Sequence, residues 1–220
     1  MAGSGHIGTI LFSWDAIPRL LRTLMNRICV YCGSSPGNLP AYAESARAFG
    51  KLLASRAIGL VYGGGNIGLM GELAKATLEA GGEVIGVIPE SLMEKELGLR
   101  ECTQLRVVRS MHERKQMMAD LSDGFVALPG GIGTFEELLE TFTWQQLAFH
   151  DKPVGILNVA GFYDHLLAFL LHATNAQFLR SEHNDSLVVG TDGSELLEKM
   201  KIWQPLRLGK WWDRPAAEAR

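Results

Sequence analysis

Several features that define large protein classes are scarce or missing in this sequence. Only three cysteines occur in 220 residues, no Lys/Arg run dominates any segment, and the formal net charge is -3 with a pI near 6.1. No apolar run approaches the roughly 20 residues that a membrane-spanning helix needs. We therefore expect no nucleic-acid or membrane partner, and any anion-binding site should be local.

The cysteines and histidines have no spacing that predicts a metal or redox centre. Cys29 and Cys32 form a C-x-x-C within "RICVYC", but this stretch has the pattern of a strand, in which side chains three apart point to opposite faces. Cys102 is distant in the sequence, and the six histidines are scattered. We predict no metal site and no cofactor.

The remaining composition is typical of one globular domain. Hydrophobic residues make up 47% of the chain and charged residues 20%, which suits a sizeable core. The opening stretch lacks a basic start followed by a clean apolar segment, so no secretory signal is predicted and we expect a cytoplasmic protein. No internal repeat or long low-complexity linker interrupts the pattern.

Short apolar runs alternate with helix-like or loop segments from residue 27 onward. The runs are hydrophobic almost throughout, as in strands that are buried on both faces of a sheet. The expected strands are "RICVYC", "AIGLVYG", "EVIGVIP", "QLRVV", "GFVALP" and "PVGILN". This order predicts an α/β fold, with a parallel sheet covered by helices on both faces.

The alternation covers about residues 25–204, which we expect to form the nucleotide-binding α/β domain. Residues 1–24 match none of the pattern and are interpreted as an N-terminal extension. Residues 205–220 form a C-terminal tail, in which Trp211 and Trp212 either pack on the core or mark a contact surface.

A glycine-rich turn, "LPGGIGTFEE" at residues 128–137, joins an expected strand to a helix expected over residues 134–148. Glycines let the backbone approach a ligand, and the free amides at a helix start suit an anion such as phosphate. The alternative is a tight loop capped by Thr134, with Glu136 and Glu137 merely complementing the helix dipole. The stretch alone leaves both interpretations open.

Two further turns are rich in small residues, "CGSSPG" at 32–37 and "GGGNIG" at 63–68. Turns of this kind gather beyond the carboxyl ends of parallel strands, so the three turns are expected to line one pocket. The second turn also satisfies G-x-G-x-x-G, with Glu90 at about the spacing of a ribose-binding acid, which would mean a nicotinamide site. That fingerprint usually occupies the first turn of its fold, and a turn that lets the helix from about Ile67 approach the sheet is equally consistent.

The segment "SMHERKQMMADL" carries a mixed stripe of cations and apolar residues. Helical spacing places on one face Met111, Arg114, Lys115 and Met118. Because a solvated helix usually turns its charges away from such a stripe, we expect the two cations to reach a carboxylate or phosphate at the edge of the core. The alternative is that both side chains extend to water along the methionines.

Together, "PGGIGTFEE" and "MHERK" resemble the LONELY GUY (LOG) family of phosphoribohydrolases, often labelled lysine decarboxylases. The family motif P-G-G-x-G-T-x-x-E is matched in full by Pro129, Gly130, Gly131, Gly133, Thr134 and Glu137. The resemblance runs from about Ile28 to Lys199. It implies a modified Rossmann fold, a homodimer or larger homo-oligomer, and hydrolysis of the N-glycosidic bond of nucleoside 5'-monophosphates such as AMP and cytokinin ribotides.

By this resemblance, Arg114 and Glu137 form the catalytic pair. The residues implied to line the nucleotide pocket are Glu96, Lys115, Gly131, Ile132, Gly133, Thr134 and Thr143, and the glycine-rich turns add Ser34, Gly64, Gly65 and Gly130. Breaking the bond between ribose and base builds positive charge on the sugar, which a fixed carboxylate stabilises. Glu137 suits this role, whereas Glu136 points about 100° away around the helix and is interpreted as structural.

Two other functions remain open. A carrier that only binds a phosphorylated cofactor, as molybdenum-cofactor carrier proteins do, would use the same pocket, although the pair of Arg114 and Glu137 favours an enzyme. A nicotinamide-dependent oxidoreductase is the third possibility. The preference between AMP and prenylated adenine ribotides depends on the shape of the pocket around the base.

The helix expected over residues 134–148 has more apolar width than one sheet face needs to cover. Its apolar positions are Phe135, Leu138, Leu139, Phe142 and Leu147, with Trp144 off to one side. We therefore expect this helix to lie near the interface of a homodimer or larger homo-oligomer.

The first testable prediction concerns residues 1–24. Because they lie outside the alternation of strands and helices, a chain that starts at Met25 should keep both its fold and its turnover of AMP. Circular dichroism and adenine release, measured beside the full chain, check this. A shortened protein that is soluble yet inactive would mean that the extension contributes to the site.

Overall fold

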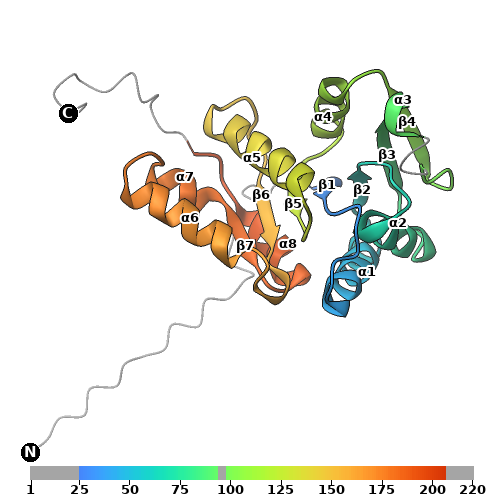
Figure 1. Ribbon diagram of the computed structural model, residues 1–220, viewed down its shortest axis with the longest axis horizontal. Coiled ribbons are helices and arrows are strands. Elements are labelled where there is room, and N and C mark those ends of the chain that lie inside the picture. Colours follow the sequence, from blue (N-terminus) through green and yellow to red (C-terminus); the bar gives the residue numbers. More distant parts are fainter. Residues whose placement is uncertain (1–24, 94–97, 207–220) are drawn as a thin grey trace, which may run out of the picture.

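A seven-stranded parallel sheet forms the centre of the molecule (Figure 1). The computed structural model describes residues 25–93 and 98–206. The strands are β1 (Arg27–Tyr31), β2 (Gly59–Tyr62), β3 (Val84–Pro89), β4 (Gln104–Val108), β5 (Gly124–Ala127), β6 (Val154–Leu157) and β7 (Val188–Gly190). Their order across the sheet is β4-β3-β2-β1-β5-β6-β7.

Helices connect the strands and cover both faces of the sheet (Figure 1). They are α1 (Pro40–Ser55), α2 (Gly68–Glu79), α3 (Glu90–Met93), α4 (Met111–Asp120), α5 (Ile132–Gln146), α6 (Asp164–Asn175), α7 (Ser181–Ser186) and α8 (Gly193–Ile202), with a 3-10 turn, η3 (Val159–Gly161). The fold class expected from the sequence is confirmed.

Two apolar cores form because side chains of a strand alternate between the faces of the sheet. On one face, Ile28 and Val30 of β1 pack with residues of α1, α2 and α8, among them Phe49. On the other face, Cys29 of β1 packs with residues of α4, α5 and α6, among them Met118. The molecule is therefore a three-layer sandwich, and α4 and α5 share one layer.

The six expected strands are all present, with ends that differ from the expected ones by two residues at most. The strand β7 was not predicted, because only three residues take part in it. The helix expected over residues 134–148 begins and ends earlier, at Ile132 and Gln146. The glycine turn is therefore shorter than expected, and Ile132 and Gly133 already belong to the helix.

The C-x-x-C pair is split by the sheet, as expected. Cys29 lies in one core and Cys32 in the other, and both are free thiols. Burial raises the pKa of each thiol, and the negative charge of Glu137 raises it further, so both stay protonated.

The order of the strands places a topological switch point between β1 and β5. From β1 the chain runs outward through β2, β3 and β4, then returns to β5 and continues outward on the other side. Connections after β1 and β5 therefore leave in opposite directions, and open α/β sheets bind ligands at the carboxyl ends of strands arranged in this way.

Among the described residues, no helix has the length and apolarity that crossing a bilayer requires. The expected cytoplasmic location stays a prediction.

Candidate active site

The three glycine-rich turns meet at the switch point. The amide of Gly33, after β1, donates to the carbonyl of Pro129, after β5, at 3.0 Å. The carbonyl of Gly33 accepts from the amide of Met70, in the first turn of α2, at 3.3 Å. The first turn therefore contacts both of the others, which supports the expectation that all three surround one site.

The second turn requires glycine at two of these contacts. Gly68 has a φ of +59°, and a Cβ on it would run into the backbone of Ser34. Gly63 faces α4, and a Cβ there would run into the guanidinium of Arg114. The absence of a side chain at Gly63 thus leaves the space that the arginine occupies.

The nicotinamide interpretation of this turn has little support in the sheet order. The turn follows β2, one strand away from the switch point between β1 and β5, whereas a dinucleotide binds across the switch point. Gly64 and Gly65 are buried, and the carbonyl of Gly64 accepts from the amide of Leu99. The close approach of α2 to the backbone of Ser34 accounts for Gly68, and the guanidinium of Arg114 accounts for Gly63.

Helix α4 begins with reciprocal caps that set its direction. The Ser110 hydroxyl accepts from the amide of Glu113 at 3.2 Å, and the Glu113 carboxylate accepts from the amide of Arg109 at 2.9 Å. This pair resembles a capping box, with the carboxylate bonding one residue before the cap. Arg114 follows directly and projects from the first turn of the helix toward the sheet.

Arg114 and Glu137 form a buried ion pair. Nη1 of Arg114 lies 3.2 Å from Oε1 of Glu137, and only 9% and 10% of the two side chains are exposed. Nε of Arg114 donates to the carbonyl of Val87 at 3.1 Å, near the end of β3. The expectation that the cations of α4 reach carboxylates is confirmed, and extension of the arginine to water is wrong.

Glu137 lies on the inner face of α5. Thr134, Leu138 and Thr141 are buried on the same side of the helix, whereas Glu136 is exposed. One turn farther along, the Thr141 hydroxyl shares a hydrogen bond of 2.9 Å with the phenol of Tyr31, at the end of β1. Burial raises the pKa of this phenol, so it stays neutral beside the carboxylate.

The first turn of α5 has backbone amides that lack an intrahelical partner. Gly131 is the N-cap, and its carbonyl accepts the first intrahelical hydrogen bond, from Phe135, at 3.1 Å. The amides of Ile132, Gly133 and Thr134 come before the first intrahelical donor and so have no partner within the helix. Gly131, Ile132 and Gly133 are exposed. With the positive end of the helix dipole, these amides suit an anion.

The cap that the alternative interpretation places at Thr134 is absent, because the N-cap is Gly131 and no side-chain cap bond is made there. Thr134 is instead buried, and a Cβ on Gly130 would run into its hydroxyl. This close contact keeps the turn against the start of the helix. The interpretation of the turn as a mere capped loop is therefore less well supported than the anion-binding one.

Lys115, which the family resemblance places in the nucleotide pocket, forms ion pairs with two carboxylates of α5. Its ammonium lies 2.7 Å from Oε1 of Glu136 and 2.9 Å from Oε1 of Glu140. Burial alone would lower the pKa of Lys115, but the hydrogen bonds to the two carboxylates outweigh it and raise the pKa. The lysine is therefore charged at neutral pH and bound to α5.

The other expected pocket residues lie in different environments. Thr143 is exposed on the outer side of α5, and its hydroxyl donates to the carbonyl of Leu139. Ser34 is exposed at the first turn, beside Gly68. Glu96 lies outside the described residues.

Three groups that hold the site together were not predicted from the sequence. The acceptor at Val87 is its backbone carbonyl. Every residue has such a carbonyl, so the residue type does not indicate this role. Glu140 has no motif or spacing that distinguishes it from other charged residues of a helix. Tyr31 was part of an expected strand, and nothing local indicated that it would reach Thr141.

A protein-family model described as possible lysine decarboxylase matches residues 70–200. The match begins in α2 and includes both members of the buried ion pair.

Curated relatives are similar over most of the chain. The probable cytokinin riboside 5'-monophosphate phosphoribohydrolase LOGL6 of Oryza sativa subsp. japonica is 47% identical over 186 residues, which are 84% of this chain and 74% of the relative. The cytokinin riboside 5'-monophosphate phosphoribohydrolase LOG5 of Arabidopsis thaliana is 44% identical over 190 residues, 86% of this chain and 83% of the relative.

Solved structures share the fold at lower identity. The molybdenum cofactor binding protein of Rippkaea orientalis has a TM-score of 0.60 and 23% identity, covering 80% of this chain and 94% of that one. The molybdenum cofactor carrier protein of Chlamydomonas reinhardtii has a TM-score of 0.59 and 23% identity, covering 80% and 96%. At this identity, the likeness concerns the fold alone.

The contact between Gly63 and Arg114 generates a prediction. Gly63→Ala should displace the guanidinium, which is the mobile end of a side chain, so the fold should survive while Arg114 loses its alignment with Glu137. Adenine release from AMP, the reaction that the family resemblance implies, should fall on the order of 10²-fold. Steady-state assays with melting curves as a folding control test this. Normal turnover in a folded variant would mean that the position of Arg114 matters little.

Proposed function

The chain belongs to the LONELY GUY family, and we propose that it hydrolyses the N-glycosidic bond of adenine-type nucleoside 5'-monophosphates to the free base and ribose 5-phosphate. The substrates are AMP and cytokinin riboside 5'-monophosphates, and the names of the curated relatives give the second of these. The observation that carries the proposal is the buried pair of Arg114 and Glu137 close to the exposed amides of α5.

The phosphate binds at the start of α5. The amides of Ile132, Gly133 and Thr134 donate to its oxygens, and the exposed glycines on either side leave room for it. Because this group is remote from the reacting bond, its binding energy is used to orient the sugar over Glu137.

Glu137 acts on the sugar. As the bond to the base lengthens, positive charge develops on the ribose, and the carboxylate stabilises this charge. Glu137 also orients a water and removes its proton as the water attacks C1' of the ribose. The hydroxyl of that water ends on the ribose and its proton on the departing base, so the products balance. A positioned base of this kind typically contributes about 10²- to 10⁴-fold.

Arg114 keeps the carboxylate ionised and directed. A buried carboxylate without a partner would favour its neutral form, and the guanidinium opposes this. The Val87 carbonyl holds Nε, so that Nη1 is left in a defined position toward Glu137.

A carrier of a phosphorylated cofactor is the second candidate, and its support is weaker. The fold is shared with molybdenum-cofactor carriers, but the curated relatives of higher identity carry the names of hydrolases. The enzyme is therefore the better-supported function.

The proposal predicts how Glu137 and the phosphate contribute to turnover. Glu137→Gln keeps the shape but removes the charge, so adenine release from AMP should fall by orders of magnitude while AMP still binds. Adenosine, which lacks the phosphate, should be a far poorer substrate than AMP for the wild type. Steady-state adenine release from both compounds and calorimetric titration with AMP measure these effects.

The controls separate chemistry from folding. Glu79→Gln changes an exposed glutamate of α2 in the same way and should leave turnover normal. Arg114→Ala should also abolish turnover and lose some AMP affinity, and leaving Glu137 without its cation should cost about 3–5 kcal/mol of stability. Equal use of adenosine, or near-normal turnover by folded Glu137→Gln, would contradict the assignment. Tight AMP binding without any adenine release would favour the carrier.

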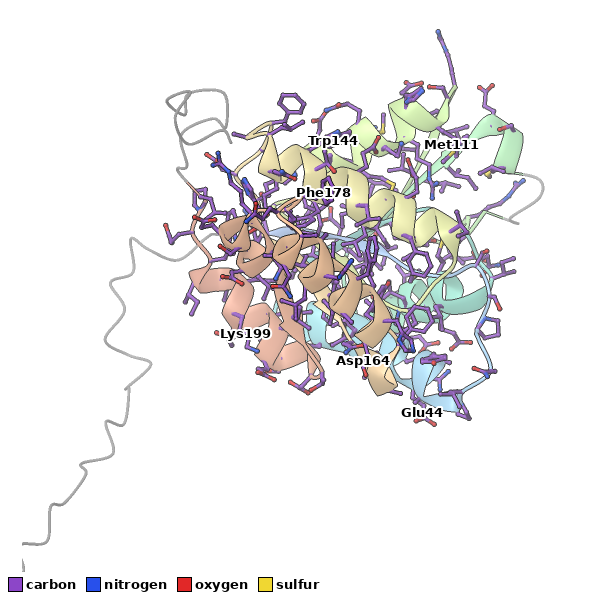
Figure 2. The ribbon with its side chains drawn as sticks, turned by 60° about the vertical axis from the view of Figure 1, so that its left-hand side comes forward. Glu44, Met111, Trp144, Asp164, Phe178 and Lys199 are labelled. Atoms are coloured by element: carbon purple, nitrogen blue, oxygen red, sulfur yellow. The ribbon has the colours of Figure 1, made fainter. Side chains whose placement is uncertain are left out.

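We also propose that the protein forms a homodimer through α5 and α6. Figure 2 shows these helices side by side. Large apolar side chains are exposed on them and on the loops that follow: Ile132, Leu139, Leu147, Phe149, Phe169, Leu171 and Phe178. An apolar surface of this extent is typical of a protein interface.

Light scattering at micromolar concentration should give the mass of at least two chains. Leu139→Glu combined with Phe169→Glu should give a monomer, because 38% and 64% of these residues are exposed and would bury charge in the interface. Val107→Glu, on the edge strand β4, is the matched control and should not change the mass. A monomeric wild type refutes the dimer, and dissociation by Val107→Glu alone places the interface elsewhere.

A further inference from the structure

A second set of ion pairs joins α4 to α5 beside the catalytic one. Lys115 follows Arg114 directly, and its two carboxylate partners, Glu136 and Glu140, lie on either side of Glu137 along α5. The Lys115 side chain is only 11% exposed, although both partners reach solvent. Neighbouring residues of α4 thus bind neighbouring residues of α5.

The two helices come from opposite sides of the switch point. Helix α4 follows β4, at one edge of the sheet, and Arg114 is held to β3 by the Val87 carbonyl. Helix α5 follows β5, on the other side of β1. The distance between Arg114 and Glu137 therefore depends on how the two halves of the layer are held together.

We propose that Lys115 is a positioning residue that holds α4 to α5 at the spacing at which Arg114 meets Glu137. This inference rests on the proposed function and concerns the same site. It gives Lys115 a role through Glu136 and Glu140, in place of the direct nucleotide contact that the family resemblance implies.

Charge argues for this assignment. The ammonium donates to two carboxylates, and a phosphate that approached it would also approach both of them. Like charges at that distance repel, and withdrawal of Lys115 toward a phosphate would leave Glu136 and Glu140 without their cation. The pair of carboxylates thus keeps the lysine on α5 and away from the substrate.

Four variants test the role of Lys115. Lys115→Met keeps an unbranched side chain but removes the charge. Lys115→Arg keeps the charge and has several N–H donors on a planar guanidinium. The double variant Glu136→Gln with Glu140→Gln removes the partners, and a triple variant combines it with Lys115→Met. Lys75→Met, at an exposed lysine of α2, is the matched control. For each, kcat and KM are measured with AMP and with adenosine, beside the melting temperature.

The inference predicts a loss in kcat without a loss in binding. Lys115→Met should lower kcat on the order of tenfold, as a small misplacement of a catalytic group does, with KM for AMP and the preference for AMP over adenosine unchanged. The double variant should show the same loss, and the triple variant no further loss, because one interaction is removed in each case. Lys115→Arg should restore most of kcat. The melting temperature should change little, since partly exposed ion pairs contribute little to stability.

A direct phosphate contact gives the opposite pattern. Lys115→Met would then raise KM for AMP and reduce the preference over adenosine, and removal of the two carboxylates would leave AMP binding unchanged or tighter. Either result overturns the inference. So does an unchanged kcat per folded molecule, with or without a lower melting temperature.

Failure of the proposed function is distinguishable. If the wild type releases no adenine, the Nε–H resonance of Arg114, which the Val87 carbonyl holds, still reports the alignment. Lys115→Met should shift this resonance in NMR spectra, and Lys75→Met should not. An unshifted resonance overturns the inference whatever the activity.

Discussion

The buried ion pair between Arg114 and Glu137 is the interaction on which the site depends. Removing two charges from water is costly, and their attraction repays the cost only when geometry is well defined. Here the Val87 carbonyl directs the guanidinium, and the inner face of α5 directs the carboxylate. Any change that moves one helix relative to the other leaves a charge buried without its partner.

Those contacts follow from the order of the strands. The switch point between β1 and β5 brings three glycine-rich turns together, and each turn allows a close approach that a side chain would prevent. Different parts of helix α5 then have different roles. Its first residues are exposed and carry amides without an intrahelical partner, its inner face carries Glu137, and its outer face carries Glu136 and exposed apolar residues. Because successive residues are about 100° apart, these roles do not interfere.

Much of this organisation was predictable from the sequence. Continuous hydrophobicity identified six strands, because strands buried on both faces need apolar side chains throughout. The glycine-rich turns were located from composition, and the assignment of Glu137 rather than Glu136 to the interior followed from helical geometry and the family motif. The separation of Cys29 from Cys32 followed from the period of a strand. All of these depend on local spacing.

The α/β class, the strand-to-helix turns and the inner faces of α4 and α5 follow from the sequence alone, since period and turn chemistry are properties of neighbouring residues. Which faces meet depends on how distant segments pack against one another. Lys115 could pair with Glu136 and Glu140 only once α4 and α5 lay in one layer, and Arg114 could find Val87 only once β3 was placed beneath it. Ion pairs between distant segments leave no periodic signal, because they depend on the packing of the whole sheet.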